Sequence, residues 1–103
     1  MDVLWAIDFF STEVWTLGGL VTFYVLFLIK LDTREVHIAG VTANPNEPWM
    51  NQIARSLTME ERGILQPGQY LIHDGDKKFG AAFKDRLDHS SVKRVPLSPG
   101  RLG

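Results

Sequence analysis

The apolar run from Leu17 to Ile29 is the feature that most constrains the fold of this chain. At about 13 residues, it is shorter than the roughly 20 residues that a membrane-spanning helix needs. Its side chains alternate with a period of two, which is typical of a strand. One face carries Val21, Phe23, Val25, Phe27, Ile29 and Leu31, and the other carries Thr22, Tyr24, Leu26, Leu28 and Lys30. The run therefore predicts a central strand over residues 19–31, buried on both sides, and no membrane partner.

Shorter patterns predict antiparallel strands before and after this run. We expect a strand over residues 3–10 and a loop over 11–13. The short polar turn at 32–34 predicts a hairpin that returns as a strand over 35–43. In that last strand we expect Val36 and Ile38 on one face, and His37, Ala39 and Val41 on the other.

The second half of the chain alternates between helix and strand patterns. A helix is predicted over 48–61, with Asn46 or Glu47 as its cap and an apolar stripe of Trp49, Ile53 and Leu57. A strand at 69–73 follows. Asp76 can cap the next helix, whose stripe is Phe79, Phe83 and Leu87, and residues 91–95 form the last strand. Strands reached through helical crossovers should lie parallel to the first strand.

Two carboxylates stand out against these strands. Asp8 interrupts the apolar run Trp5–Phe10, and Asp74 directly follows the strand at 69–73. A charge in a buried strand costs several kcal/mol unless it is compensated, and a metal ion is a good compensator. Two carboxylates at the ends of neighbouring strands can share a divalent cation, as in the two-metal sites of phosphoryl-transfer enzymes.

Length and composition set the remaining limits. The 103 residues and the 45% hydrophobic content predict one folded domain, residues 1–103. The net charge of −1 provides no general argument for nucleic-acid binding. The absence of cysteine excludes disulfides and thiolate metal sites, and it fits a cytoplasmic location.

The order of elements, together with specific segments, resembles the catalytic core of retroviral-type integrases and bacterial DDE transposases. The segments that carry the resemblance are Ala6–Phe10, Tyr24–Thr42, Thr42–Met50, Ile72–Phe79 and Val92–Gly100. The resemblance implies an α/β, ribonuclease H-like fold: a mixed five-stranded sheet, three antiparallel strands and then two parallel ones, with flanking helices. It also implies DNA integration by metal-dependent polynucleotidyl transfer, with Mg²⁺ or Mn²⁺ as cofactor and DNA as partner.

By this resemblance Asp8 and Asp74 are the first two catalytic, metal-binding carboxylates. The family's turn has glycine where this chain has Asp76, which leaves the register between Asp74 and Asp76 open. The family's third carboxylate is a Glu on a helix beyond the Ser-Pro-Gly segment, whereas the last Glu here is Glu61. We therefore expect a core that lacks the C-terminal helix with the third carboxylate, binds metal weakly and has weak or no activity.

Several residues keep alternative interpretations. His37 and His73 are candidate metal ligands, although a lone His is usually structural. Lys77, Lys78 and Lys84, together with Arg86, form either a solvated helix face or a surface that contacts nucleic-acid phosphates. The alternative function is a non-catalytic module that binds nucleic acid, associates with itself or pairs with full-length integrase.

Overall fold

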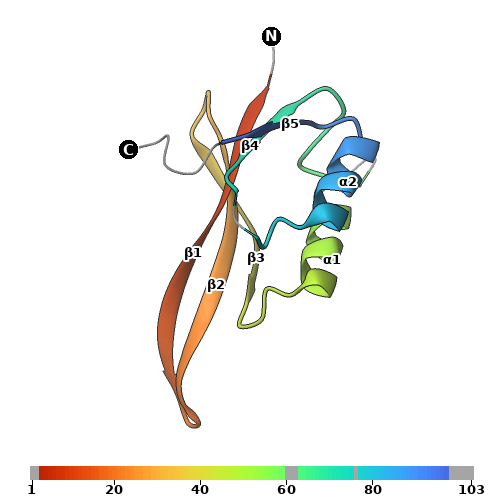
Figure 1. The fold of residues 1–103 in the computed structure, drawn as a ribbon. Coiled ribbons are helices and arrows are strands. Elements are labelled where there is room, and N and C mark those ends of the chain that lie inside the picture. The colour runs from red at the N-terminus through yellow and green to blue at the C-terminus, as the bar shows by residue number, and fades with distance from the viewer. Residues whose placement is uncertain (1–2, 60–62, 76, 98–103) are drawn as a thin grey trace.

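The structure, a computed structural model, describes residues 3–59, 63–75 and 77–97 (Figure 1). Three strands come first, and two further strands alternate with two helices after them. The elements are β1 (Leu4–Thr16), β2 (Gly19–Lys30), β3 (Glu35–Thr42), α1 (Glu47–Leu57), β4 (Tyr70–His73), α2 (Ala81–His89) and β5 (Lys93–Pro96).

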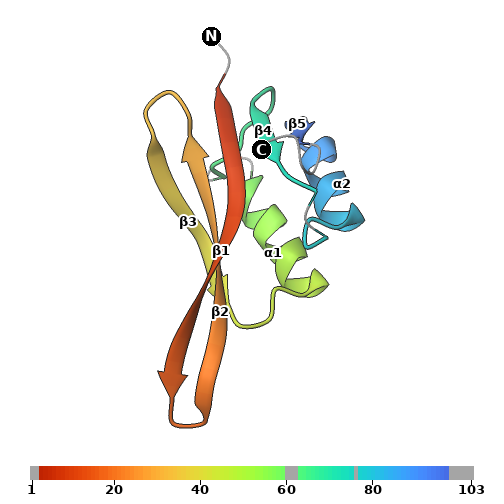
Figure 2. The ribbon, with the colours of Figure 1, turned by 60° about the vertical axis from the view of Figure 1, so that its left-hand side comes forward.

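The strands form one mixed sheet in the order β3-β2-β1-β4-β5. β1 pairs antiparallel with β2, and β2 pairs antiparallel with β3, whereas β4 lies parallel to β1 and β5 parallel to β4. The predicted architecture is therefore confirmed. Figures 1 and 2 show α1 and α2 on the same side of the sheet, which we call the helix-covered face. The opposite side, the open face, carries Phe10, Val36, Ile38 and Val41, all of them exposed.

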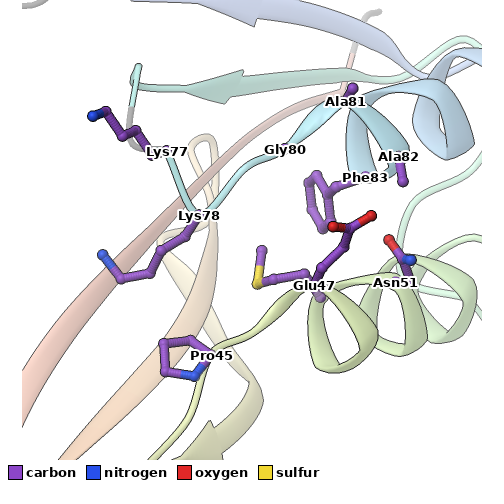
Figure 3. A pocket seen from close by; sticks show the side chains of 10 residues that line it. Pro45, Glu47, Asn51, Lys77, Lys78, Gly80, Ala81, Ala82 and Phe83 are labelled. Atoms are coloured by element: carbon purple, nitrogen blue, oxygen red, sulfur yellow. The ribbon is translucent and has the colours of Figure 1, made fainter.

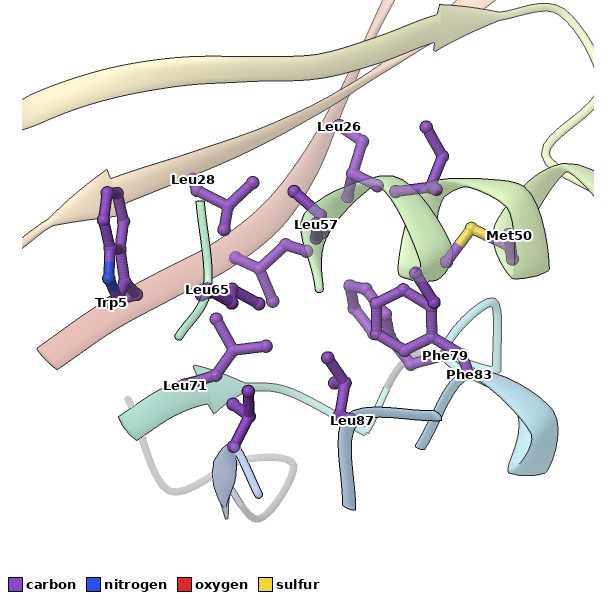
Figure 4. Packing of buried hydrophobic residues seen from close by; sticks show 14 residues of the cluster. Trp5, Leu26, Leu28, Met50, Leu57, Leu65, Leu71, Phe79, Phe83 and Leu87 are labelled. Atoms are coloured by element: carbon purple, nitrogen blue, oxygen red, sulfur yellow. The ribbon is translucent and has the colours of Figure 1, made fainter. Parts of the chain in front are cut away.

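The core lies between the helix-covered face and the two helices (Figure 4). The periodic apolar residues of α1 and α2 pack against those of β1, β2 and β4, and three connecting residues fill the remaining space. The cluster consists of Trp5, Ile7, Leu26, Leu28, Met50, Ile53, Ala54, Leu57, Leu65, Leu71, Phe79, Phe83, Leu87 and Val92. Trp49, predicted as part of the α1 stripe, is half-buried against this cluster.

β2 is an interior strand, but the prediction that it is buried on both sides is wrong. Its helix-side residues Leu26 and Leu28 have no exposed surface. On the open face Val25 is 9% exposed, but Val21, Phe23 and Phe27 are only half-buried, because no helix among the described residues covers them. An antiparallel sheet tolerates this arrangement, with one face packed and the other open.

The predicted loop at 11–13 is also wrong, because β1 continues to Thr16. β1 and β2 pair without interruption from Trp5 with Lys30 to Thr16 with Gly19. The β-branched and aromatic side chains of Thr12, Val14 and Trp15 favour this extension. β3 ends opposite Tyr24, so the outer part of the β1–β2 hairpin projects beyond the sheet (Figure 1).

A bulge in β3 changes the predicted alternation of its side chains. Phe27 pairs with Ile38 and Leu26 with Gly40, which leaves Ala39 as the extra residue. The phase shifts there, so Val41 joins Val36 and Ile38 on the open face instead of lying opposite them.

The end of α1, the cap of α2 and the start of β5 depart from the prediction. Asn46 caps α1, with Oδ1 accepting a hydrogen bond from the Trp49 backbone N–H at 3.0 Å, but α1 ends at Leu57 instead of 61. The cap of α2 is Gly80, not Asp76, which lies outside the described residues. β5 begins at Lys93 because Ser91 takes the left-handed conformation (φ 61°) in the turn after α2.

Candidate metal and nucleic-acid site

Asp8 lies in β1, and Asp74 directly follows β4, the parallel neighbour of β1 in the sheet. The registered pairs of the two strands end with Ala6 and Ile72, and each aspartate lies two residues further along the chain. The predicted adjacency of the first and fourth strands is confirmed. That the two carboxylates share one ion stays a prediction.

Asp8 belongs to the open face. Along β1, Ile7 and Phe9 pack toward the helices, so Asp8 between them faces the other way. Along β4, Leu71 and His73 are buried under the helices, and Asp74 directly follows the end of this strand. No helix covers this side in the part of the chain that the structure describes.

Asp8 is exposed, so the sequence argument from a buried charge does not hold for it. Its Oδ1 accepts a hydrogen bond from the Phe9 backbone N–H at 2.8 Å, which orients the carboxylate near the strand. Asp74 is half-buried and directly follows β4. The case for a metal site therefore rests on the placement of two carboxylates together and not on desolvation.

The donor chemistry fits part of a magnesium or manganese site. Mg²⁺ prefers carboxylate oxygens and keeps several of its waters, so one or two carboxylates are a usual protein contribution. Among residues 3–59, 63–75 and 77–97, no group of three or more His, Cys, Asp or Glu side chains is close enough together to hold a metal ion. Asp76, the other candidate for the second ligand, lies outside these residues.

The two candidate histidine ligands lie on the helix-covered face, across the sheet from Asp8. His73 is 3% exposed, and its Nδ1 lies 3.0 Å from the backbone oxygen of Asp74. His37 has its Nε2 2.7 Å from a Glu35 carboxylate oxygen, and its ring meets the Trp5 ring edge-on at 5.5 Å. The His73 ring thus contacts the backbone of Asp74, whereas the His37 ring contacts Glu35 and Trp5.

Lys77 and Lys78 line a pocket of about 250 Å³ between the first turns of α1 and α2. Figure 3 shows their ammonium groups pointing away from Glu47, the acidic residue of this pocket. The Lys78 ammonium lies 5.1 Å from the Phe9 ring centre and 5.4 Å from that of Tyr24. Lys84 is half-buried on α2 and is not among the residues that line the pocket.

One further group of charged residues lies near Asp74 and was not predicted from the sequence. Arg94 on β5 donates from Nε to Asp88 Oδ1 at 2.8 Å and from Nη2 to Asp88 Oδ2 at 2.9 Å. This two-point hydrogen bond holds the pKa of Asp88 below its usual value and raises the pKa of Arg94. The two residues are six apart, across the turn between α2 and β5, and that spacing has no recognised sequence pattern.

Comparisons with known proteins show the fold. No family model matches the sequence, and no curated protein matches it. The structure is similar to the HTLV-2 integrase catalytic core domain in complex with magnesium, in its trimeric form, with a TM-score of 0.64 and 8% identity over 93% of this chain. It is also similar to a chain of the simian T-cell lymphotropic virus intasome in complex with the PP2A regulatory subunit B56 gamma, with a TM-score of 0.66 and 8% identity over 96% of this chain.

These similarities establish an integrase core-like, ribonuclease H-like fold. The chain spans 60% of the length of the first of these chains and 35% of the second. Among the described residues, neither helix has the length and apolar character needed to cross a membrane.

Proposed function

We propose that the chain is an integrase- or transposase-like catalytic core of a mobile element, with a role in DNA integration by metal-dependent polynucleotidyl transfer. One observation carries the proposal. Within an integrase core-like fold, Asp8 on β1 and Asp74 just after β4 each lie two residues beyond the last registered pair of these adjacent parallel strands. Two carboxylates so placed are the start of a phosphoryl-transfer metal site.

In this proposal Asp8 and Asp74 would hold the Mg²⁺ or Mn²⁺ ions. When bound, such ions polarise the scissile phosphate and activate water or a 3′-hydroxyl. A third carboxylate is not grouped with Asp8 and Asp74 in the described part of the chain. We therefore expect weak metal binding and weak or no activity from this chain alone.

DNA is the proposed partner, in the reducing cytoplasm that the cysteine-free sequence suits. Lys77, Lys78 and Lys84 are the proposed phosphate contacts, because the first two belong to the segment that follows Asp74 and all three are cationic. Lys78 lies on the helix-covered side of the sheet. A DNA strand that contacts both Lys78 and the aspartates must therefore pass around the end of the sheet where β4 ends.

Paramagnetic manganese tests the metal site directly. In a ¹⁵N-labelled sample, added Mn²⁺ should first broaden the amide signals next to Asp8 and Asp74. Asp8→Asn, which keeps the side-chain shape and removes the charge, should abolish this broadening. Asp32→Asn is the matched control, because Asp32 is an exposed aspartate in the turn after β2. Broadening that is the same in Asp8→Asn and the unmodified chain would refute the proposed site.

A second candidate function is pairing with another integrase-like core. The observation that favours it is the open face, where Val36, Ile38 and Val41 are 57%, 56% and 55% exposed. Exposed apolar patches of this kind are common at protein interfaces. The partner that we propose is a second copy of this chain.

A further inference from the structure

Asp74 differs from Asp8 in how its backbone is held. Asp8 lies inside β1 and is registered with Phe27 of β2. Asp74 lies beyond the last residue of β4, and the pairing of β1 with β4 has already ended at Ile72. Strand pairing therefore fixes the backbone of Asp8, whereas Asp74 lies beyond the paired part of β4.

The ring of His73 supplies a contact to the Asp74 backbone. His73 is buried under the helices and packs near Phe79, with ring centres 6.0 Å apart. Its Nδ1 lies 3.0 Å from the Asp74 carbonyl oxygen, an atom that can only accept a hydrogen bond. Its backbone oxygen accepts a bond from the Leu97 N–H at 2.8 Å, which fixes the end of β4 against the chain that follows β5.

Arg94 determines which nitrogen of that ring carries the proton. Arg94 Nη1 lies 3.4 Å from His73 Nε2, at the long end for a hydrogen bond. A guanidinium has donors only, so Nε2 must accept. The proton of the neutral ring is then on Nδ1, where it can be donated to the Asp74 oxygen. The two geometries require the same tautomer.

Asp88 holds the guanidinium in this orientation. Arg94 uses Nε and Nη2 for the two carboxylate oxygens of Asp88, and these bonds leave Nη1 directed at His73. A planar guanidinium bound at two points cannot rotate freely. The contacts thus run from Asp88 in the last turn of α2, through Arg94 and His73, to the backbone of Asp74.

We propose that Arg94 is a positioning residue for Asp74, acting through the Nδ1–H tautomer of His73 and held in place by Asp88. This inference rests on the proposed function, because it concerns the second metal-binding carboxylate. It assigns Arg94 and His73 no contact with metal or DNA. The competing explanation is that the three residues only stabilise the fold around a buried histidine.

Two NMR measurements that need no metal separate these explanations. Long-range ¹H–¹⁵N spectra should show His73 protonated on Nδ1 in the unmodified chain. Arg94→Met should give a mixture of tautomers, and the order parameter of the Asp74 amide should fall from about 0.85 toward 0.6 or below. Lys93→Met, the same change at the neighbouring residue of β5, should leave both measurements unchanged.

Manganese binding provides the functional measurement. Arg94→Met should weaken Mn²⁺ binding at Asp8 and Asp74 by about tenfold, the usual effect of losing a residue that orients a metal ligand. Lys93→Met should bind like the unmodified chain. Asp88→Asn, which loses the two-point bond and leaves Arg94 in place, should have a smaller effect in the same direction, and it provides the test if Arg94→Met does not fold.

The outcomes distinguish this inference from the proposed function. If the unmodified chain binds no Mn²⁺ at the two aspartates, the proposed function fails, and the positioning role is judged by the tautomer and the Asp74 order parameter. If Arg94→Met and Asp88→Asn leave the tautomer, the order parameter and any Mn²⁺ affinity as they are in Lys93→Met, the positioning role is refuted.

Discussion

Asp8 in β1 and Asp74 just after β4 each lie two residues beyond Ala6 and Ile72, the last registered pair of these adjacent parallel strands. Asp8 comes from the interior of a long hairpin strand, whereas Asp74 follows a strand of four residues. The proposed metal site thus joins a rigid carboxylate to one that depends on its local surroundings.

The first prediction concerns chemistry. With two carboxylates and no third grouped with them among the described residues, this chain alone should show no magnesium-dependent nicking or strand transfer. The assay is strand transfer on labelled duplex that carries the ends of the proposed mobile element. Extending the chain by a helix that bears a Glu should recover activity, and Asp8→Asn in that extended chain should abolish it. Magnesium-dependent cleavage by the 103-residue chain, lost in Asp8→Asn, would show that another residue completes the site.

Some properties of Asp8 and Asp74 could be predicted from the sequence and others could not. Their adjacency was predictable, because a helical crossover makes the fourth strand parallel to the first. The exposure of Asp8 was not predictable from an apolar run, since a strand in a sheet with one open face looks similar to a fully buried one. The link from Asp88 through Arg94 to His73 depends on how α2 packs against the parallel strands, which no local pattern encodes.

The fold, too, has features that the sequence predicts and features that it does not. Periodicity predicted the element order and the sheet topology, whereas the polar cluster Ser11-Thr12-Glu13 concealed the outer part of β1. The cross-strand pairing with β2 outweighs the turn preference of those residues. The bulge at Ala39 follows from the sheet's geometry and reverses the facing of Val41, although nothing in the alternation of residues 35–43 indicates it.

The second prediction concerns Gly40. A Cβ added there would lie 2.8 Å from Trp49 Cζ2 and 3.0 Å from Ile53 Cδ1, because α1 packs directly on this part of β3. Gly40→Ala should lower the free energy of unfolding by about 1 to 3 kcal/mol, as overpacking usually does. Chemical denaturation measures the change. Gly18→Ala is the control, since its added Cβ would meet only Thr16 Oγ1, at 3.8 Å.

The third prediction concerns acid stability. The hydrogen bonds from Arg94 lower the pKa of Asp88 in the folded chain, so the pair stabilises the fold above the unfolded pKa of about 3.9. This stabilisation should be lost as pH falls through the folded pKa. Because the Asp88 side chain is 48% exposed, we expect about 1 kcal/mol or less at pH 7.

A double-mutant cycle of Asp88→Asn and Arg94→Met measures the contribution of the Asp88–Arg94 pair to the free energy of unfolding, as a coupling energy. The coupling should be present at neutral pH and should vanish once Asp88 is protonated. A coupling energy that stays the same from neutral pH to strongly acidic pH would contradict the assignment.

The fourth prediction concerns the open face. Exposed Val36, Ile38 and Val41 should promote self-association at micromolar concentration, measured by sedimentation. Ile38→Asn should reduce it, because a polar amide disfavours burial between two copies. Met59→Gln is a suitable control, since Met59 is 51% exposed and lies outside the sheet. A clean monomer at all concentrations would exclude the pairing function.

The fifth prediction concerns DNA. If Lys77 and Lys78 each neutralise a phosphate, replacing either by Asn should weaken binding to any duplex sequence and reduce the salt slope of log K by about 1. Fluorescence anisotropy at several salt concentrations measures that slope. Lys93→Asn on β5 should not change it. An unchanged slope in both Lys77→Asn and Lys78→Asn would assign the two lysines to an ordinary solvated surface.

The projecting part of the β1–β2 hairpin should unfold locally at a lower free energy than the rest of the sheet. Beyond Phe10 and Tyr24 its two strands pair with no further strand among the described residues, so its amides should exchange with solvent through local fraying while the sheet under α1 and α2 stays closed. The tryptophans fall on both sides of this division, since Trp15 is 80% exposed near the tip and Trp5 is 5% exposed in the core. Fluorescence from Trp15 should therefore report the early loosening of the tip, and Trp5 the cooperative loss of the whole fold.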